Sequence, residues 1–149
     1  MDTHNLLDNL ADLDLTNVQI GQPVIDNQSP LCRTGEVHIE PLEAELRPNG
    51  QPKRRMVIPL VLEEPASSSK GETLQPGFKT TVSFLIDGHK GWTDDRGKQA
   101  LKEFASAVLK RDVTSVTNLE ELRNQTVRPL FVAQKNDASR QDVRRWNKA

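Results

Sequence analysis

The 149-residue sequence has one cysteine, no tyrosine and no long apolar run, and each scarcity excludes a class of protein. The single cysteine, Cys32, cannot form a disulfide within the chain, so we expect a reducing compartment. No apolar run approaches the roughly 18 residues that a membrane-spanning helix needs, so we expect no membrane association. The N-terminus is acidic and lacks the basic and apolar segments of a secretory signal, which is therefore not expected either.

Motifs for catalysis and metal binding are also missing. The three histidines are scattered, and Cys32 has no cysteine or histidine at the spacing of a metal site. We find no phosphate-binding loop, nucleophile elbow or acidic metal-binding loop. The pair Asp94 and Asp95 is interpreted as acids that favour the start of a helix. The sequence therefore predicts a protein that is not an enzyme, with no catalytic residues, metal or cofactor.

The charge that is present is unevenly distributed, although the net charge is only −1. Residues 1–50 carry nine acids and two bases, a net of −7, whereas residues 51–149 carry eighteen bases and twelve acids, a net of +6. A basic body with an acidic leader favours a polyanion-binding surface, or contact faces of opposite charge in an assembly. The alternative is a charged surface that only keeps a small domain soluble.

The chain is predicted to consist of an N-terminal leader, residues 1–34, and one β-rich domain, residues 35–149. Three leucines of the leader follow the spacing of a helix face, so we expect a short amphipathic helix within residues 1–15. Such a helix is too short to be stable alone in water, and should dock on the body or on a partner. The docking residues are Leu6, Leu10 and Leu13. Residues 16–34 are interpreted as an irregular connector, with a short strand at Val18–Ile20.

Alternating apolar and polar residues, separated by turn-forming residues, predict five strands in the body. A segment rich in serine, glycine and proline, residues 65–77, is interpreted as a flexible loop. Three prolines fall within the predicted strands and must lie at bulges, edges or outward-facing positions; they are Pro41, Pro59 and Pro129. The predicted strands are 35–46, which is bent, 54–63, 78–87, 127–134 and 143–146.

One amphipathic helix is predicted over residues 94–111, between the third and fourth strands. Its apolar stripe recurs with the period of an α-helix and comprises Leu101, Phe104, Ala105, Val108 and Leu109. A capping box that begins at Thr117 predicts a second, short helix ending at Leu122. Three strands, a helix and two strands predict a mainly β fold, a small antiparallel five-stranded barrel of the oligonucleotide/oligosaccharide-binding (OB) type.

Basic residues fall where an OB barrel lines its binding groove, at the first and last hairpin loops and on the second and third strands. Cations in such a groove can follow a phosphate backbone and release its counterions. The alternative is again a solvated basic surface. The candidate nucleic-acid-binding residues are Lys53, Arg54, Arg55, Lys79, Lys135, Arg140, Arg144, Arg145 and Lys148.

Aromatic residues, which usually stack on bases in single-strand binders, are few. The four phenylalanines, Phe78 among them, fall in core-like patterns. The two tryptophans, Trp92 and Trp146, lie near loops or ends and close to basic residues, so they are the candidate stacking residues. Contacts with the nucleic-acid backbone should then dominate binding.

A series of segments resembles a bacteriophage family, a domain of unknown function that is described as OB-fold and single-stranded-DNA-binding-like. The similarity covers most of residues 12–147 as a succession of degenerate elements. Unlike many replication-type single-strand binders, the chain ends in a basic segment, QDVRRWNKA, where those carry an acidic tail. The matching segments are DLDLTNV (12–18), GEVHIEPLEAEL (35–46), RRMVIPLVLEE (54–64), KGETLQPGF (70–78), ALKEFASAVL (100–109) and LRNQTVRPLFVAQ (122–134).

This resemblance implies a non-catalytic protein of the host cytoplasm that binds single-stranded DNA during phage replication or recombination. A protein of a different class is the alternative, namely a virion structural protein such as a capsid decoration or connector subunit. In that case the leader leucines would dock on a second copy of the chain or on another phage protein.

Overall fold

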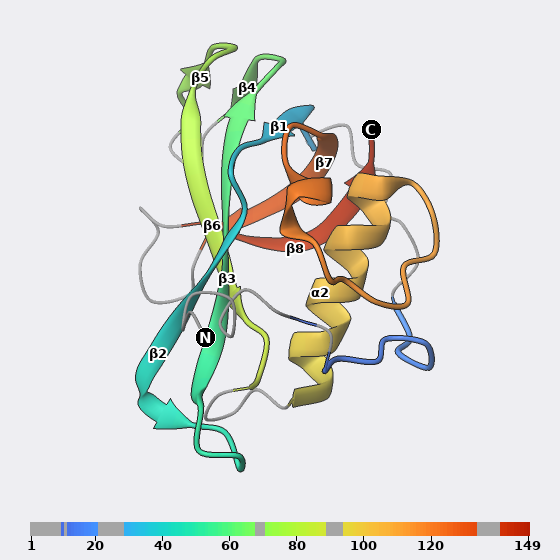
Figure 1. Cartoon of the computed structure of the whole chain (residues 1–149). Coiled ribbons are helices and arrows are strands. Elements are labelled where there is room, and N and C mark those ends of the chain that lie inside the picture. Colours follow the sequence, from blue (N-terminus) through green and yellow to red (C-terminus); the bar gives the residue numbers. More distant parts are fainter. Residues whose placement is uncertain (1–9, 11, 21–28, 68–70, 89–93, 134–140) are drawn as a thin grey trace.

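A computed structural model describes residue 10 and residues 12–20, 29–67, 71–88, 94–133 and 141–149. Their strands form one six-stranded antiparallel sheet and a separate two-stranded one, and the main helix packs against the larger sheet (Figure 1). The elements are β1 (Cys32–Thr34), β2 (His38–Leu46), β3 (Pro52–Leu62), β4 (Ala66–Ser67), β5 (Thr73–Leu74), β6 (Lys79–Leu85), α2 (Asp94–Leu109), the 3₁₀ helix η1 (Leu119–Leu122), β7 (Thr126–Ala133) and β8 (Gln141–Lys148). The prediction of a mainly β protein with its main helix between the third and fourth long strands is confirmed.

Strands β1 and β2 are two halves of one bent strand along the same edge of β3. Thr34 pairs with Leu60, and His38 with Val57, so the register shifts by only one residue across the break. At the break the Gly35 amide donates to the Pro59 carbonyl over 2.8 Å, and a Cβ on this glycine would lie 3.0 Å from the Pro59 Cβ. Glycine is therefore the residue that fits where the strand bends past the proline.

Counted with β1 and β2 as one strand, the large sheet has the order β6, β3, β1/β2, β7, β8. No pairing joins β6 to β8 within the described residues, so the sheet is not closed there and the predicted five-stranded barrel is not confirmed. Helix α2 binds the backbone of β8 beside this opening. The Glu103 carboxylate accepts a hydrogen bond from the Trp146 backbone amide over 2.9 Å. This amide of β8 is therefore bound by the helix and not by a neighbouring strand.

The core lies between α2 and the inward face of the sheet. Leu101 and Phe104 of the predicted stripe are fully buried, as are Met56 and Ile58 of β3. The Phe104 ring packs edge-to-face on Trp146, with ring centroids 4.6 Å apart. The stripe predicted from helical periodicity is therefore the part of α2 that forms the core.

The leader belongs to the same core. Leu10, Leu13 and also Leu15 are buried in it, so the described leucines dock on their own chain; Leu6 lies outside the described residues. Residues 12–20 contain turns but no strand, so the predicted strand at Val18–Ile20 is absent. Most of the predicted helix, residues 1–9 and 11, lies outside the described residues. Lys102 on α2 holds the described part of the leader: it is 4% exposed and donates to the backbone carbonyls of Leu15 (2.7 Å) and Val18 (2.9 Å).

Three smaller expectations also need correction. The segment expected to be a flexible loop contains the β4–β5 hairpin. The short helix η1 is capped by Asn118 instead of Thr117, because the Asn118 side chain accepts from the Glu120 amide over 3.0 Å. The sheet begins at Cys32, before Gly35, and its last strand reaches Lys148. No helix in the described ranges is long and apolar enough to cross a membrane.

Candidate nucleic-acid interface

Alternation along β3 sorts the three predicted cations Lys53, Arg54 and Arg55 onto two faces. Arg54 is in phase with the buried residues Met56 and Ile58, whereas Lys53 and Arg55 point to the other side of the sheet. We call that side the β3–β6 outer face. Its residues are Lys53, Arg55, Val57, Pro59 and Val61 of β3, with Lys79, Thr81 and Ser83 of β6.

Two cations of the β3–β6 outer face are available to a ligand. Arg55 and Lys79 have no ion-pair partner among the residues that the structure describes. Lys79 pairs across the strands with Val61, which is six residues from Arg55, so the two cations lie about 20 Å apart. Lys53 shares the face, but its ammonium nitrogen is 3.6 Å from a Glu45 carboxylate oxygen. The face therefore presents widely spaced positive charge, with the acid Glu40 of β2 directly across from Arg55.

Arg54 does not join this face, contrary to expectation, because its side chain is 1% exposed and held by carboxylates. The Asp87 carboxylate accepts from the Arg54 backbone amide, from Nε and from Nη2, each over 2.8 Å. Burial alone would lower the pKa of Arg54, but the hydrogen bonds with Asp87 and Asp12 raise it above its usual value. Arg54 therefore stays charged inside the protein.

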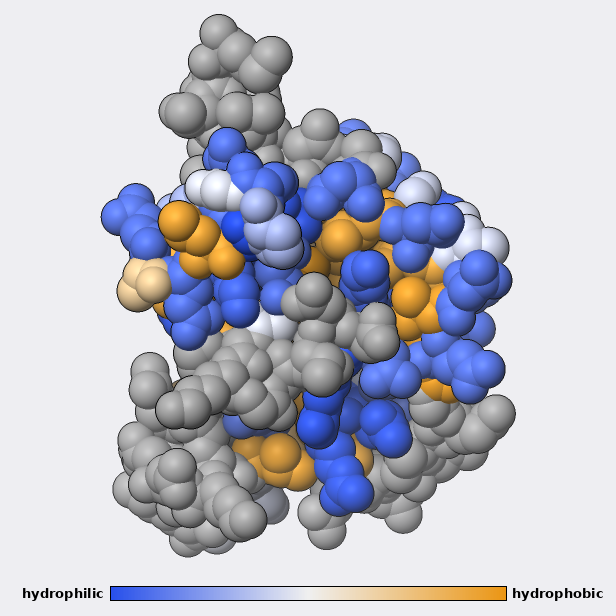
Figure 2. Space-filling view, turned by 90° about the horizontal axis from the view of Figure 1, so that it is seen from below, coloured by the Kyte–Doolittle hydropathy of each residue, from blue (hydrophilic) through white to orange (hydrophobic). Residues whose placement is uncertain are grey.

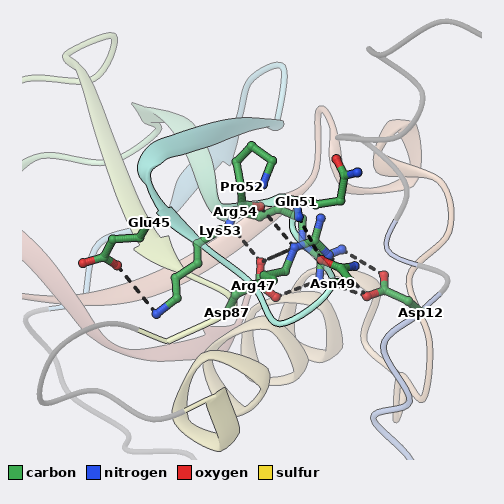
Figure 3. A network of polar contacts seen from close by, with 9 residues as sticks. All are labelled: Asp12, Glu45, Arg47, Asn49, Gln51, Pro52, Lys53, Arg54 and Asp87. Atoms are coloured by element: carbon green, nitrogen blue, oxygen red, sulfur yellow. Dashed lines mark hydrogen bonds and ion pairs between the residues drawn. The ribbon is translucent and has the colours of Figure 1, made fainter.

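Asp12 of the leader and Arg47 of the β2–β3 turn complete what we call the Arg54 cluster, namely Asp12, Arg47, Arg54 and Asp87 (Figure 3). Asp12 accepts from Arg54 Nη1 over 2.8 Å and from Nη2 over 3.1 Å. Arg47 lies 3.6 Å from the Asp12 carboxylate and 3.7 Å from that of Asp87. Partial burial works to raise the pKa of Asp12, but the Arg54 hydrogen bond and charge lower it overall.

The basic C-terminal segment is divided between surface and core. Arg144 is exposed and lies at a β-bulge. Arg145 pairs with Leu130 and Val143 with Phe131, so Arg144 between them has no partner residue on β7. Arg145 lies 3.7 Å from the Glu103 carboxylate on α2, and Lys148 is exposed. Trp146, a predicted stacking residue, is instead part of the core. Its side chain is 7% exposed and packs against Phe104.

One aromatic residue that the sequence placed in the core is exposed instead. Phe78 is 44% exposed just before β6, after a turn in which Gly77 has a φ of +95°. The turn-forming residues Pro76 and Gly77 directly precede Phe78. They could have indicated that Phe78 lies at the start of a strand, at the edge of the core. The predicted site residues Lys135, Arg140 and Trp92 lie outside the described residues.

The surface has a shallow polar hollow of about 590 Å³ that is lined by none of the predicted site residues in the described chain. Thr34, Gly35, Glu36, Glu120, Arg123 and Asn124 line it. The surface viewed from below in Figure 2 is mainly hydrophilic, with separate hydrophobic patches. Within the described ranges, no three histidine, cysteine, aspartate or glutamate side chains gather as metal ligands would.

The described surface thus offers cations that can contact phosphates and one exposed ring that can contact a base. The cations come from β3, β6 and β8, and the ring precedes β6. Comparison of the chain with protein-family models, with curated proteins and with solved structures finds no match.

Proposed function

We propose that this protein is a non-catalytic, phage-type OB-fold protein that binds single-stranded DNA along the β3–β6 outer face, in replication or recombination. The strand order supports the OB assignment. Five strands, with β1 and β2 as one bent strand, follow the order β6, β3, β1/β2, β7, β8. An OB fold is a five-stranded, partly open barrel that binds oligonucleotides on the face of its second and third strands. Those strands are β3 and β6 here.

The observation that carries the proposal is the pair of available cations on that face. Arg55 and Lys79 come from different strands and share one side of the sheet, and neither makes an ion pair in the described chain, although Glu40 lies across from Arg55. Such cations can replace the counterions of a phosphate backbone, which gives affinity without reading the base sequence. The face has no aromatic side chain of its own, so we expect moderate binding that is indifferent to sequence.

The described leader leucines give no support to the structural-subunit alternative. That alternative used the leader leucines as contacts with a neighbouring subunit. Leu10 and Leu13 are buried in the core of their own chain, so their apolar surface is already covered.

We expect binding of an unstructured oligonucleotide to weaken steeply with salt. Replacing both Arg55 and Lys79 with alanine should reduce the log–log salt slope by about 0.7 for each phosphate of a single strand that the variant no longer neutralises. All base sequences should be affected alike, because phosphate contacts carry no sequence information. Fluorescence anisotropy over a salt series measures both quantities.

The matched control is Arg111→Ala, which removes an exposed cation beyond the end of α2. It should change the slope much less than the double variant. Equal slopes for the two variants would show that the β3–β6 outer face is not the binding surface. If the wild-type protein shows no salt-sensitive binding at low ionic strength, the DNA-binding proposal is wrong.

A further inference from the structure

The two carboxylates on Arg54 differ in how accessible they are. Asp87 is 9% exposed and binds the Nε side of the guanidinium, together with the Arg54 backbone amide. Asp12 is 54% exposed and binds the outer edge, Nη1 and Nη2, through both of its oxygens. The inner carboxylate is therefore structural, whereas the outer one lies at the boundary with solvent.

Arg47 adds a second guanidinium to the same outer position, 3.6 Å from the Asp12 carboxylate. Its position is set by the β2–β3 turn, since Arg47 Nε donates to the Pro52 carbonyl over 3.1 Å and its backbone amide donates to the Gln51 carbonyl over 2.7 Å. Two arginines that converge on one exposed carboxylate also suit a phosphate, because guanidinium binds both anions in the same forked geometry.

We propose that Arg54 and Arg47 form a phosphate-binding site, which Asp12 of the leader occupies until a phosphate of the DNA backbone displaces its carboxylate. The proposal rests on the function proposed above. Arg54 is next to Arg55 of the β3–β6 outer face but on the opposite side of β3, at the end where the β2–β3 turn lies (Figure 1). A strand that leaves the outer face around this turn meets the Arg54 cluster.

Displacement of the Asp12 side chain does not require the leader to leave the core. Leu10, Leu13 and Leu15 hold the leader, and Lys102 fastens its backbone carbonyls independently of Asp12. A change of the Asp12 side-chain rotamer toward solvent is therefore sufficient. Arg54 keeps Asp87 as its partner throughout, while the cluster changes from two cations and two anions to two cations and one anion. The resulting gain of net positive charge attracts an anion from solution.

The test compares Asp12→Asn with Asp14→Asn, each of which removes one negative charge from the leader. Asp14 is a matched control because its carboxylate accepts from the nearby Thr16 amide over 2.9 Å and lies outside the Arg54 cluster. Asp12→Asn should bind an unstructured oligonucleotide roughly five- to tenfold more tightly than Asp14→Asn at low salt, the net effect of one typical hydrogen bond. Its salt slope should be steeper by about 0.7, since one more phosphate is neutralised.

A second measurement is independent of DNA binding and uses inorganic phosphate alone. A ligand that binds only the folded state raises the melting temperature, so phosphate should stabilise Asp12→Asn more than Asp14→Asn at matched ionic strength. Equal phosphate stabilisation and equal DNA affinity of the two variants would overturn the phosphate site. If phosphate distinguishes the variants but the wild-type protein and both variants leave DNA unbound at low salt, the anion site stands and the DNA-binding function falls.

Discussion

Replacing Arg54 with alanine is expected to lower the free energy of unfolding by about 3–5 kcal/mol, because it leaves Asp87 buried without its cation. The side chain of Arg54 is 1% exposed and that of Asp87 9%. The control is Arg55→Ala, one residue along the same strand, whose side chain points to the outer face and should change stability by only about 0.5 kcal/mol. Urea unfolding of the two variants measures the difference.

The pair Arg54→Met with Asp87→Leu should recover part of the stability, since apolar residues can replace a buried ion pair but the Arg54 backbone amide loses its acceptor. Recovery would show that the damage comes from the unpaired carboxylate. If Arg54→Ala and Arg55→Ala lower the stability equally, the Arg54 cluster does not hold the fold together.

The same cluster predicts a decrease of stability in acid. The pKa of Asp12 in the folded protein lies below its ordinary value of 3.8. A lowered pKa means that the contribution of Asp12 is fully present above the ordinary value and disappears as the pH falls through the folded-state pKa. Below about pH 4, the wild-type protein should therefore lose more stability than Asp12→Asn, which has no carboxylate to protonate. Urea midpoints at a series of pH values, compared between the two proteins, measure this difference.

The second large effect is expected for Gly97→Ala, although alanine is the better helix former by about 1 kcal/mol. A Cβ at Gly97 in α2 would lie 2.1 Å from the backbone oxygen of Ile86 and 2.6 Å from that of Leu85. Backbone atoms cannot rotate out of the way as a side chain can, so the helix must move off the end of β6. We expect the free energy of unfolding to fall by about 3 kcal/mol in thermal or urea denaturation.

Lys98→Ala is the control for Gly97→Ala, because it changes the adjacent helical residue at a half-buried position. It should leave the stability within about 0.5 kcal/mol of the wild-type protein. A gain of about 1 kcal/mol for Gly97→Ala would follow helix propensity alone, and would contradict the close approach of α2 to β6.

The elements with strong local periodicity could be predicted from the sequence. Leu101 and Phe104 recur at helical spacing, and both are fully buried on α2. The alternation of Met56, Ile58 and Leu60 likewise identifies the inward face of β3. In both cases residues a few positions apart determine which side is apolar, so a local pattern suffices.

The parts that could not be predicted depend on partners far away in the sequence. Arg54 is in phase with Met56, which signals an inward position, but its partner Asp87 is 33 residues away. The attachment of β8 to the helix depends on a similar contact, since the Glu103 carboxylate on α2 accepts from the Trp146 backbone amide, 43 residues away. The contact that holds Leu15 could not be predicted either, since Lys102 binds its backbone carbonyl from 87 residues away. A pattern within a few neighbouring residues cannot predict contacts of this kind.

The fastening of the leader by α2 has a consequence for synthesis on the ribosome. Leu15 is made 87 residues before Lys102, the side chain that binds its carbonyl. At a translation rate of about 5–20 residues per second, this interval lasts roughly 4–17 s. During that time the nascent chain carries leucines whose place in the core does not yet exist, so these leucines are made well before the helix that covers them. Exposed apolar segments of this kind are what holding chaperones bind.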